Sequence, residues 1–258
     1  MEFPLSRVVA PHLDVLPETG STNVELAARA STGAEPHFAV VATTSQTAGK
    51  GRLGRTWIAP PGKTLAVSVL LRPAAMSSAG LGWLPLLAGL AMTRAVASLV
   101  EGPSVTLKWP NDVHVDGLKV SGLLSELVPT GVVIGAGLNL FMAEEELPTP
   151  TSTSLTLTGA TVDDLADRAL AAYLTELREL YDSFAASDLD AEKSGLRGAV
   201  TRACSTIGRS VKVELPGGAE LFGTATDIDG LGRLVISRLE DARLEPIAAG
   251  DVTHLRHQ

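Results

Sequence analysis

Three cations stand close together in the run TAGKGRLGRTW, residues 47–57, of a chain that is acidic as a whole. Lys50, Arg52 and Arg55 are interspersed here with three glycines, whereas the chain has a formal net charge of -8. Because glycines weaken both helices and strands, the run predicts a loop. Its freed backbone N–H groups and its cationic side chains could bind an anion. The spacing is not that of a P-loop, so a solvated surface loop is the alternative for this run alone.

A second group of polar residues belongs to the sequence KWPND and to a hairpin predicted directly after it. The Asp-Gly pair at 116–117, between Val-His-Val and Leu-Lys-Val, has the type expected in a two-residue hairpin turn. A lysine about 4 Å from a phosphate gains on the order of 4 kcal/mol at an effective dielectric constant of about 20. Such a lysine could hold a nucleotide or stabilise a phosphoryl-transfer transition state, although each residue taken singly also fits an ordinary strand end. The residues around this hairpin are Lys108, Asn111, Asp112 and Lys119.

The composition fits a folded protein of one or two domains and excludes several classes of protein. Of the 258 residues 45% are hydrophobic, and 29 acidic residues outnumber 21 basic ones. This acidic excess argues against a general nucleic-acid-binding protein, which would carry a basic face. The single cysteine, Cys204, excludes an internal disulfide and is expected in the core. The N-terminal residues lack the pattern of a secretory signal, so we expect a cytoplasmic protein.

The first part of the chain, about residues 15–142, mixes strand and helix patterns. The apolar runs FAVVATT and TLAVSVLL have strand length and bracket the glycine run, and GVVIGAGLNL follows as another strand. Thr22 and Glu25 have the spacing of a capping box and predict the start of a helix. Arg94 interrupts the apolar run at residues 81–100, which we expect to be a buried helix and not a membrane span. These patterns predict an α+β fold with a mixed or antiparallel sheet and helices on one face.

The second part begins with an acidic stretch rich in proline and threonine, residues 143–160, which predicts an exposed connection. Thr161 and Asp164 are placed to cap the helix that follows. From about Ile207, short strands separated by Pro-Gly-Gly and Asp-Gly are typical of a small β-barrel or sandwich. We therefore divide the chain into residues 1–205 and 206–258. His254, in the terminal tail, is expected in solvent.

Five motifs in this chain closely resemble those of the biotin protein ligases, in the same order and at similar separations. They are STN, QTAGKGRLGRTW, KWPNDV, LKVSGLLSE and GAGLNL, and the resemblance covers roughly residues 15–142. The terminal strands resemble the SH3-like C-terminal domain of that family. The resemblance implies a first domain related to the core of class II aminoacyl-tRNA synthetases.

The resemblance also implies a reaction in two steps. The carboxylate of biotin attacks the α-phosphate of ATP to give biotinyl-5'-adenylate and pyrophosphate, and a lysine of a biotin carboxyl carrier protein or domain then takes the biotinyl group. A carboxylate and a polyphosphate repel each other, so cations must lie between them. Lys119, the basic loop and Mg²⁺ can serve as those cations, and no residue is assigned as a metal ligand.

Roles for individual residues follow from the resemblance. Lys119 matches a lysine that contacts both the biotin carboxylate and the phosphate, and Asp112 matches a residue that receives the acceptor lysine. Trp57 matches a residue that packs against adenine, and Asn139 an asparagine near the adenine amine. The implied catalytic residues are Lys119, Asp112, Arg52 and Lys50. The implied biotin- and nucleotide-binding residues are Ser21, Thr22, Asn23, Gln46, Gly49, Lys50, Gly51, Arg52, Arg55, Trp57, Asn111, Lys119, Gly122, Gly137 and Asn139.

The chain departs from the family pattern at two positions. Lys50 replaces the first arginine of Gly-Arg-Gly-Arg-x-Gly-Arg, and lysine cannot make the planar two-pronged contact of arginine. We therefore expect a looser hold on biotinyl-adenylate. Ser121 stands where the family often has alanine, a small change from which the sequence gives no basis to infer an effect. About twenty residues precede Ser21, so we expect no helix-turn-helix domain and no DNA partner.

Two other functions stay open on the sequence alone. Ligases and transferases of lipoate or octanoate share the acyl-transfer logic, but they lack this glycine-arginine loop followed by KWPND. A sensor that only binds biotin or its adenylate would need the pocket but not Asp112, for which a turn-stabilising role is also open. A homodimer is possible. We expect the loop at residues 47–57 to become ordered only when an anion binds.

Overall fold

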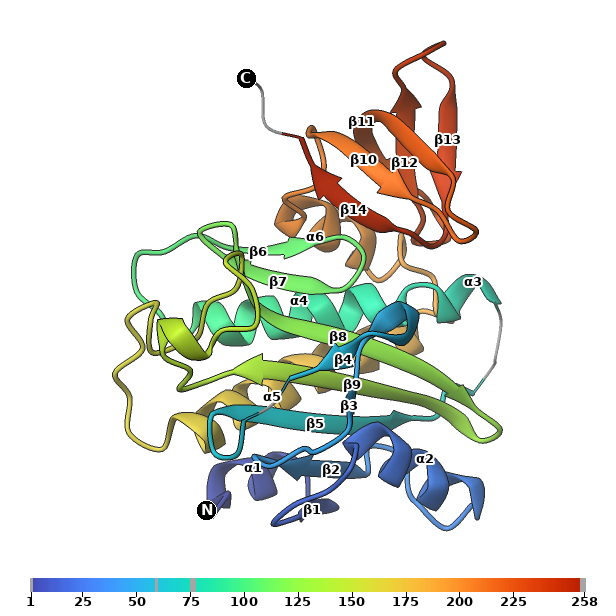
Figure 1. Cartoon of the computed structure of the whole chain (residues 1–258). Helices are drawn as coiled ribbons and strands as arrows, with labels where there is room; N and C mark the ends of the chain where they lie inside the picture. Colours follow the sequence, from blue (N-terminus) through green and yellow to red (C-terminus); the bar gives the residue numbers. More distant parts are fainter. Residues whose placement is uncertain (1, 59, 75–77, 256–258) are drawn as a thin grey trace.

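Seven strands form one sheet in the first part of the chain, as Figure 1 shows. The computed structural model describes residues 2–58, 60–74 and 78–255. The strand order is β1-β2-β5-β9-β8-β7-β6, with β1 and β2 parallel and the other neighbours antiparallel. This confirms the predicted mixed sheet and the predicted hairpin, which joins β7 to β8. The strands are β1 (Leu13–Val15), β2 (Val40–Thr43), β5 (Thr64–Leu71), β6 (Val105–Lys108), β7 (Asp112–Val115), β8 (Leu118–Val128) and β9 (Gly131–Asn139).

Three helices cover one face of this sheet: α1 (Pro4–Val9), α4 (Leu84–Ala97) and α5 (Leu165–Ala186) (Figure 1). Alternate residues of β5, such as Leu65, Val67 and Val69, point into the core between sheet and helices. Helix α4 is apolar on almost every side and buried, as predicted for this part of the sequence. Within the described residues, no helix is both long enough and apolar enough to cross a membrane.

The opposite face of the sheet carries α2 (Thr22–Ser31) and a short hairpin. Leu26 of α2 packs in a second, smaller core with Val41 and Leu70, which point away from the first core. The prediction that all helices lie on one face is therefore wrong for α2, because β2 and β5 bury apolar residues on both sides. The glycine run forms the hairpin over this face, with strands β3 (Gly49–Lys50) and β4 (Thr56–Trp57) joined by the 3-10 turn η1 (Arg52–Gly54).

The last part of the chain forms a second, five-stranded sheet, hereafter the C-terminal sheet. Its order is β13-β12-β11-β10-β14, and every neighbouring pair is antiparallel. Buried Val211 and Val213 alternate with polar neighbours, which is the pattern that predicted short strands here. Helix α6 (Leu196–Ala203) precedes this sheet. The strands are β10 (Ser210–Glu214), β11 (Glu220–Ile228), β12 (Leu234–Arg238), β13 (Leu244–Ile247) and β14 (Asp251–His254).

Two indole N–H groups fasten the C-terminal sheet to the rest of the chain. Trp83 Nε1 donates to the carbonyl oxygen of Gly230 at 2.9 Å, and Trp109 Nε1 donates to that of Gly232 at 3.2 Å. Both carbonyls belong to the turn between β11 and β12. Gly232 has φ +78°, and a Cβ there would lie 2.9 Å from the carbonyl oxygen of Gly82. The turn therefore fits closely against the first part of the chain.

Three local predictions need correction. The stretch at residues 143–160 contains the short turn η2 (Glu144–Glu146), but its middle is buried at Thr153, Ser154 and Leu155 and is not an exposed connection. Helices α2 and α5 begin where predicted, yet neither N-cap makes a side-chain capping bond. His254 is half-buried, with Nε2 3.2 Å from the hydroxyl of Thr206, and is not a solvated tail residue.

Candidate active site

Glycines on two neighbouring strands form the floor of a cavity between the sheet and the β3–β4 hairpin. A Cβ on Gly137 would lie 2.3 Å from the indole of Trp57, so only glycine leaves room for this ring. A Cβ on Gly122 would lie 3.1 Å from both Trp57 and the Nζ of Lys119. Trp57 therefore lies against the sheet, and the Nζ of Lys119 lies over its ring, 5.8 Å from the ring centroid. The indole face is suited to stacking against a flat apolar or aromatic ligand.

The N-terminal end of α2 supplies a group of polar side chains at one end of the cavity. The backbone N–H of Thr22 donates to Oε1 of Gln46 at 3.0 Å, which leaves the amide nitrogen of Gln46 as a donor. Ser21, at the N-cap, lines the cavity beside them. Ser68 on β5 donates its hydroxyl hydrogen to this group from below, with the hydroxyl of Thr22 at 2.8 Å and the side-chain oxygen of Asn23 at 2.6 Å. This end can recognise a compact polar group that both donates and accepts hydrogen bonds.

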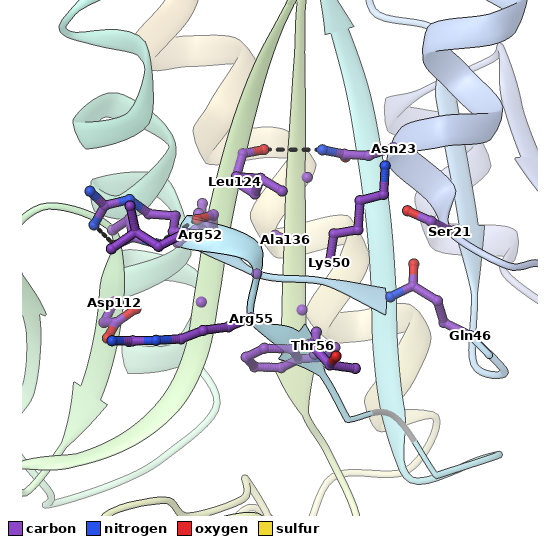
Figure 2. A pocket seen from close by; sticks show the side chains of 18 of the residues that line it. Ser21, Asn23, Gln46, Lys50, Arg52, Arg55, Thr56, Asp112, Leu124 and Ala136 are labelled. Carbon is purple, nitrogen blue, oxygen red and sulfur yellow. Dashed lines mark hydrogen bonds between the residues drawn. The ribbon is translucent and has the colours of Figure 1, made fainter. Parts of the chain in front are cut away.

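The hairpin brings its two arginines to the opposite end of the cavity, whereas Lys50 extends toward Asn23 (Figure 2). Arg52 donates to Oδ1 of Asn111 at 3.0 Å and to the carbonyl oxygen of Gly250 at 3.3 Å. Arg55 forms an ion pair with Asp251 of β14. Burial lowers the pKa of the Arg52 guanidinium. The hydrogen bond between Arg55 and Asp251 raises the pKa of Arg55. The C-terminal sheet therefore helps to hold the loop that carries these charges.

Lys119 and Asp112 form an ion pair beside these arginines, with Nζ 2.8 Å from Oδ1. The backbone of Lys119 pairs with the segment at residues 151–153. Its N–H donates to the carbonyl of Thr151, and its carbonyl accepts from the N–H of Thr153. These bonds explain why the middle of residues 143–160 is buried. Lys108 lies directly opposite Asp112 in the β6–β7 pair, and burial lowers the pKa of this lysine.

Most of the predicted site residues meet at this one cavity, which encloses about 830 Å³ with its open mouth included. Fourteen of the predicted positions lie in its lining, but Gly49 and Asn139 do not. Gly49 lines a second hollow beside the hairpin, and the side-chain amide of buried Asn139 donates to the carbonyl of Thr153 at 2.9 Å. Lining residues that the sequence analysis did not name are Leu53, Thr56, Leu123, Leu124, Gly135, Ala136 and Asp251.

The missed residues differ in how far the sequence could have indicated them. Gly135 and Gly137 alternate in GVVIGAGLNL, so both face the same side of a strand, and this signal could have found Gly135. Asp251 gave no such signal, because its place beside Arg55 depends on how the C-terminal sheet docks. Among the described residues, no three His, Cys, Asp or Glu side chains gather in a way that could hold a metal ion.

Comparisons with known proteins agree with this architecture. The family model described as Biotin/lipoate A/B protein ligase family matches residues 17–139, and the model described as Biotin protein ligase C terminal domain matches residues 206–255. The structure of biotin protein ligase from Aquifex aeolicus in complex with biotin and ATP superposes with a TM-score of 0.75 at 27% identity. That match covers 95% of this chain and 99% of the Aquifex chain.

Two curated relatives extend the comparison along the sequence. The bifunctional ligase/repressor BirA of Escherichia coli is 32% identical over 216 residues, which are 81% of this chain and 64% of that protein. The biotin–[acetyl-CoA-carboxylase] ligase of Mycobacterium tuberculosis is 41% identical over 252 residues, which are 95% of this chain and 89% of that protein. With its fold, its cavity and this similarity over nearly its whole length, the chain belongs to the biotin protein ligase family.

Proposed function

We propose that the chain activates biotin with ATP and attaches it to a lysine of a biotin carboxyl carrier domain. The observation that carries this proposal is a single cavity with hydrogen-bonding groups at one end and Arg52, Arg55 and Lys119 at the other. Such a cavity suits a ligand with a compact polar head, an apolar middle and an anionic end. Biotin has this form, with a cyclic urea, a fused ring with an alkyl chain, and a carboxylate.

In the first step a carboxylate oxygen of biotin attacks the α-phosphorus of ATP, and the bond to the bridging oxygen of pyrophosphate breaks. Both reactants are anionic, so their approach requires cations placed beforehand. Lys119 would lie between the carboxylate and the α-phosphate, and Arg52 and Arg55 would bind phosphate oxygens. To do so the Lys119 ammonium must leave Asp112. Two bound anions attract it more strongly than the single carboxylate of Asp112 does.

In the second step the amine of the acceptor lysine attacks the carbonyl carbon of biotinyl-adenylate, and AMP leaves. The amine must lose a proton to act as a nucleophile. Asp112 would receive the ammonium group of that lysine and help to remove its proton. Its position beside Lys119 supports this role, because the carboxylate then lies next to the mixed anhydride.

The remaining assignments are proposals of the same kind. Trp57 would cover the adenine ring, and Asn139 would act near the adenine amine through its contact with the segment at Thr153. Mg²⁺ would enter on the triphosphate as part of the substrate. We further propose an SH3-like C-terminal domain at residues 206–258 and a class II synthetase-like domain at residues 1–205. A homodimer, the lack of a DNA partner and a cytoplasmic location stay proposals as well.

Biotin-dependent exchange of pyrophosphate into ATP tests the activation step. We expect exchange with biotin and none with lipoate, and we expect label from radioactive biotin to appear on a carrier domain when one is added. Exchange with lipoate would identify a lipoate ligase. Binding of biotin without exchange would identify a sensor.

A further inference from the structure

We propose that Glu126, which lies outside the cavity lining, keeps the Thr22 hydroxyl inside the cavity as a hydrogen-bond acceptor. The inference rests on the proposed function, because it concerns the end of the cavity that would hold the biotin head group. Glu126 would act through Asn23 and Ser68. It is therefore a positioning residue and not a catalytic one.

The side-chain amide of Asn23 has one orientation that its neighbours allow. Its Nδ2 lies 2.6 Å from a carboxylate oxygen of Glu126 and 3.3 Å from the carbonyl oxygen of Leu124. Both neighbours can only accept, so the amide N–H₂ must face them. A Cβ on Gly135 would lie 2.1 Å from Oδ1 of Asn23, so this glycine lets the amide lie flat on the sheet. The oxygen of Asn23 is therefore directed at Ser68.

Ser68 has one hydroxyl hydrogen and two oxygen neighbours. Oδ1 of Asn23 is 2.6 Å away and cannot donate, whereas Oγ1 of Thr22 is 2.8 Å away. Two oxygens at 2.6 Å without a hydrogen between them would repel each other, so the hydrogen of Ser68 goes to Asn23. Ser68 is fully buried, and water does not compete for that hydrogen. The oxygen of Thr22 is thereby left free of the Ser68 hydrogen.

Thr22 then presents lone pairs to the cavity. Its own hydroxyl hydrogen has two acceptors within the protein, Oγ of Ser68 at 2.8 Å and Oε1 of Gln46 at 3.3 Å. The hydroxyl oxygen therefore accepts from a ligand N–H, while the amide nitrogen of Gln46 donates to a ligand carbonyl beside it. A cyclic urea offers both an N–H and a carbonyl, but a dithiolane ring offers neither. Because an unpaired buried polar group is costly, this arrangement selects biotin over lipoate.

The chain of contacts ends on a charge. Glu126 is half-buried and lines the second hollow beside the hairpin together with Lys50 (Figure 2 shows the Lys50 side chain extending toward Asn23). A carboxylate holds an N–H donor about twice as strongly as a neutral acceptor does. If the Asn23 amide turned over, Ser68 would accept from it and would donate to Thr22, whose oxygen would then keep one lone pair for the cavity in place of two.

Three variants test this direction of hydrogen bonding. Asn23→Asp places a carboxylate against Glu126, and we expect the Kd for biotin to rise at least tenfold. In Glu126→Gln the new amide can still accept from Asn23, so we expect a rise of threefold or less. In the double variant Asn23→Asp with Glu126→Gln, the glutamine N–H₂ donates to the new carboxylate, whose other oxygen still takes the Ser68 hydrogen. We expect this double variant to recover biotin binding to within about fivefold of wild type.

The readouts are titration calorimetry with biotin, the KM for ATP in pyrophosphate exchange, and thermal unfolding without ligand. A positioning role predicts that the KM for biotin changes while the KM for ATP stays within twofold, and that the double variant is rescued. The inference is overturned if the double variant binds no better than Asn23→Asp, if Glu126→Gln is equally weak, or if Asn23→Asp binds like wild type. If wild type itself fails to bind biotin, the proposed function is wrong. If wild type binds biotin and only the variants depart from these expectations, the inference alone is wrong.

Discussion

The ammonium of Lys119 and the carboxylate of Asp112 lie 2.8 Å apart, so the cation proposed for the first step and the anion proposed for the second neutralise each other. The side chains are 32% and 21% exposed, which leaves both within reach of a ligand. A biotin carboxylate and a phosphate would draw Lys119 toward them. Asp112 would then be free to receive the acceptor lysine, so one ion pair would serve both steps in turn.

Asp112→Asn should separate the two steps. The amide keeps the size of the side chain but cannot take the ammonium proton, and general-base assistance contributes about 10²- to 10⁴-fold to a rate. We expect pyrophosphate release within about threefold of wild type and transfer to a carrier domain at least 100-fold slower. Single-turnover transfer from preformed biotinyl-adenylate measures the second step alone. An equal fall in both rates would show that Asp112 has a structural role only.

Gly137→Ala should displace Trp57, because the added Cβ would lie 2.3 Å from the indole. We expect the KM for ATP to rise about tenfold or more, with a smaller change in the Kd for biotin, since the ring is proposed to cover adenine. Gly230→Ala is the matched control, because a Cβ there meets nothing within 4 Å. Unchanged ATP kinetics in Gly137→Ala would contradict the role of Trp57.

The sequence predicted the secondary-structure elements around the site better than it predicted the contacts between them. Strand lengths and the Asp-Gly hairpin depend on local patterns and were predicted correctly. The cation-rich run was predicted as a loop, but it forms the short hairpin of β3 and β4. The pairing of Arg55 with Asp251 depends on two indole bonds to a turn far along the chain, and no local pattern encodes that docking. Side-chain caps failed for a similar reason, since the Thr22 hydroxyl contacts Gln46 and the Glu25 carboxylate accepts from Arg29, so neither side chain bonds the helix N-terminus.

Lys50→Arg should slow the release of biotinyl-adenylate. Lys50 lines the cavity with its side chain extending toward Asn23. By the family resemblance its position holds an arginine, which could bind the phosphate of the intermediate with two parallel hydrogen bonds where lysine has a single point of contact. We expect a release rate severalfold lower than that of wild type, measured by dilution of preloaded enzyme into excess unlabelled biotin and ATP. A release rate equal to that of wild type would falsify the idea that this replacement loosens the hold on the intermediate.

Acid should destabilise the protein in part through His254. Burial, helped by Lys108, His114 and Arg209, lowers the pKa of this histidine to about 4. The unfolded chain, with a histidine pKa near 6.5, binds the proton first, so the free energy of unfolding should fall as the pH drops from about 6.5 to about 4. His254→Gln removes this titration and should give a shallower acid limb in urea unfolding. An identical slope in the variant would contradict the expectation.

The most direct test of the central claim is pyrophosphate release from ATP and Mg²⁺, with and without biotin, for wild type beside Lys119→Ala. Lys119 is proposed to lie between two anions that would otherwise repel each other, so its loss should remove several kcal/mol of transition-state stabilisation. We expect biotin-dependent release by wild type, a loss of at least 10²-fold in the variant, and biotin on an added carrier domain with wild type only. Equal release by the two proteins, or none by wild type with biotin bound, would contradict the account.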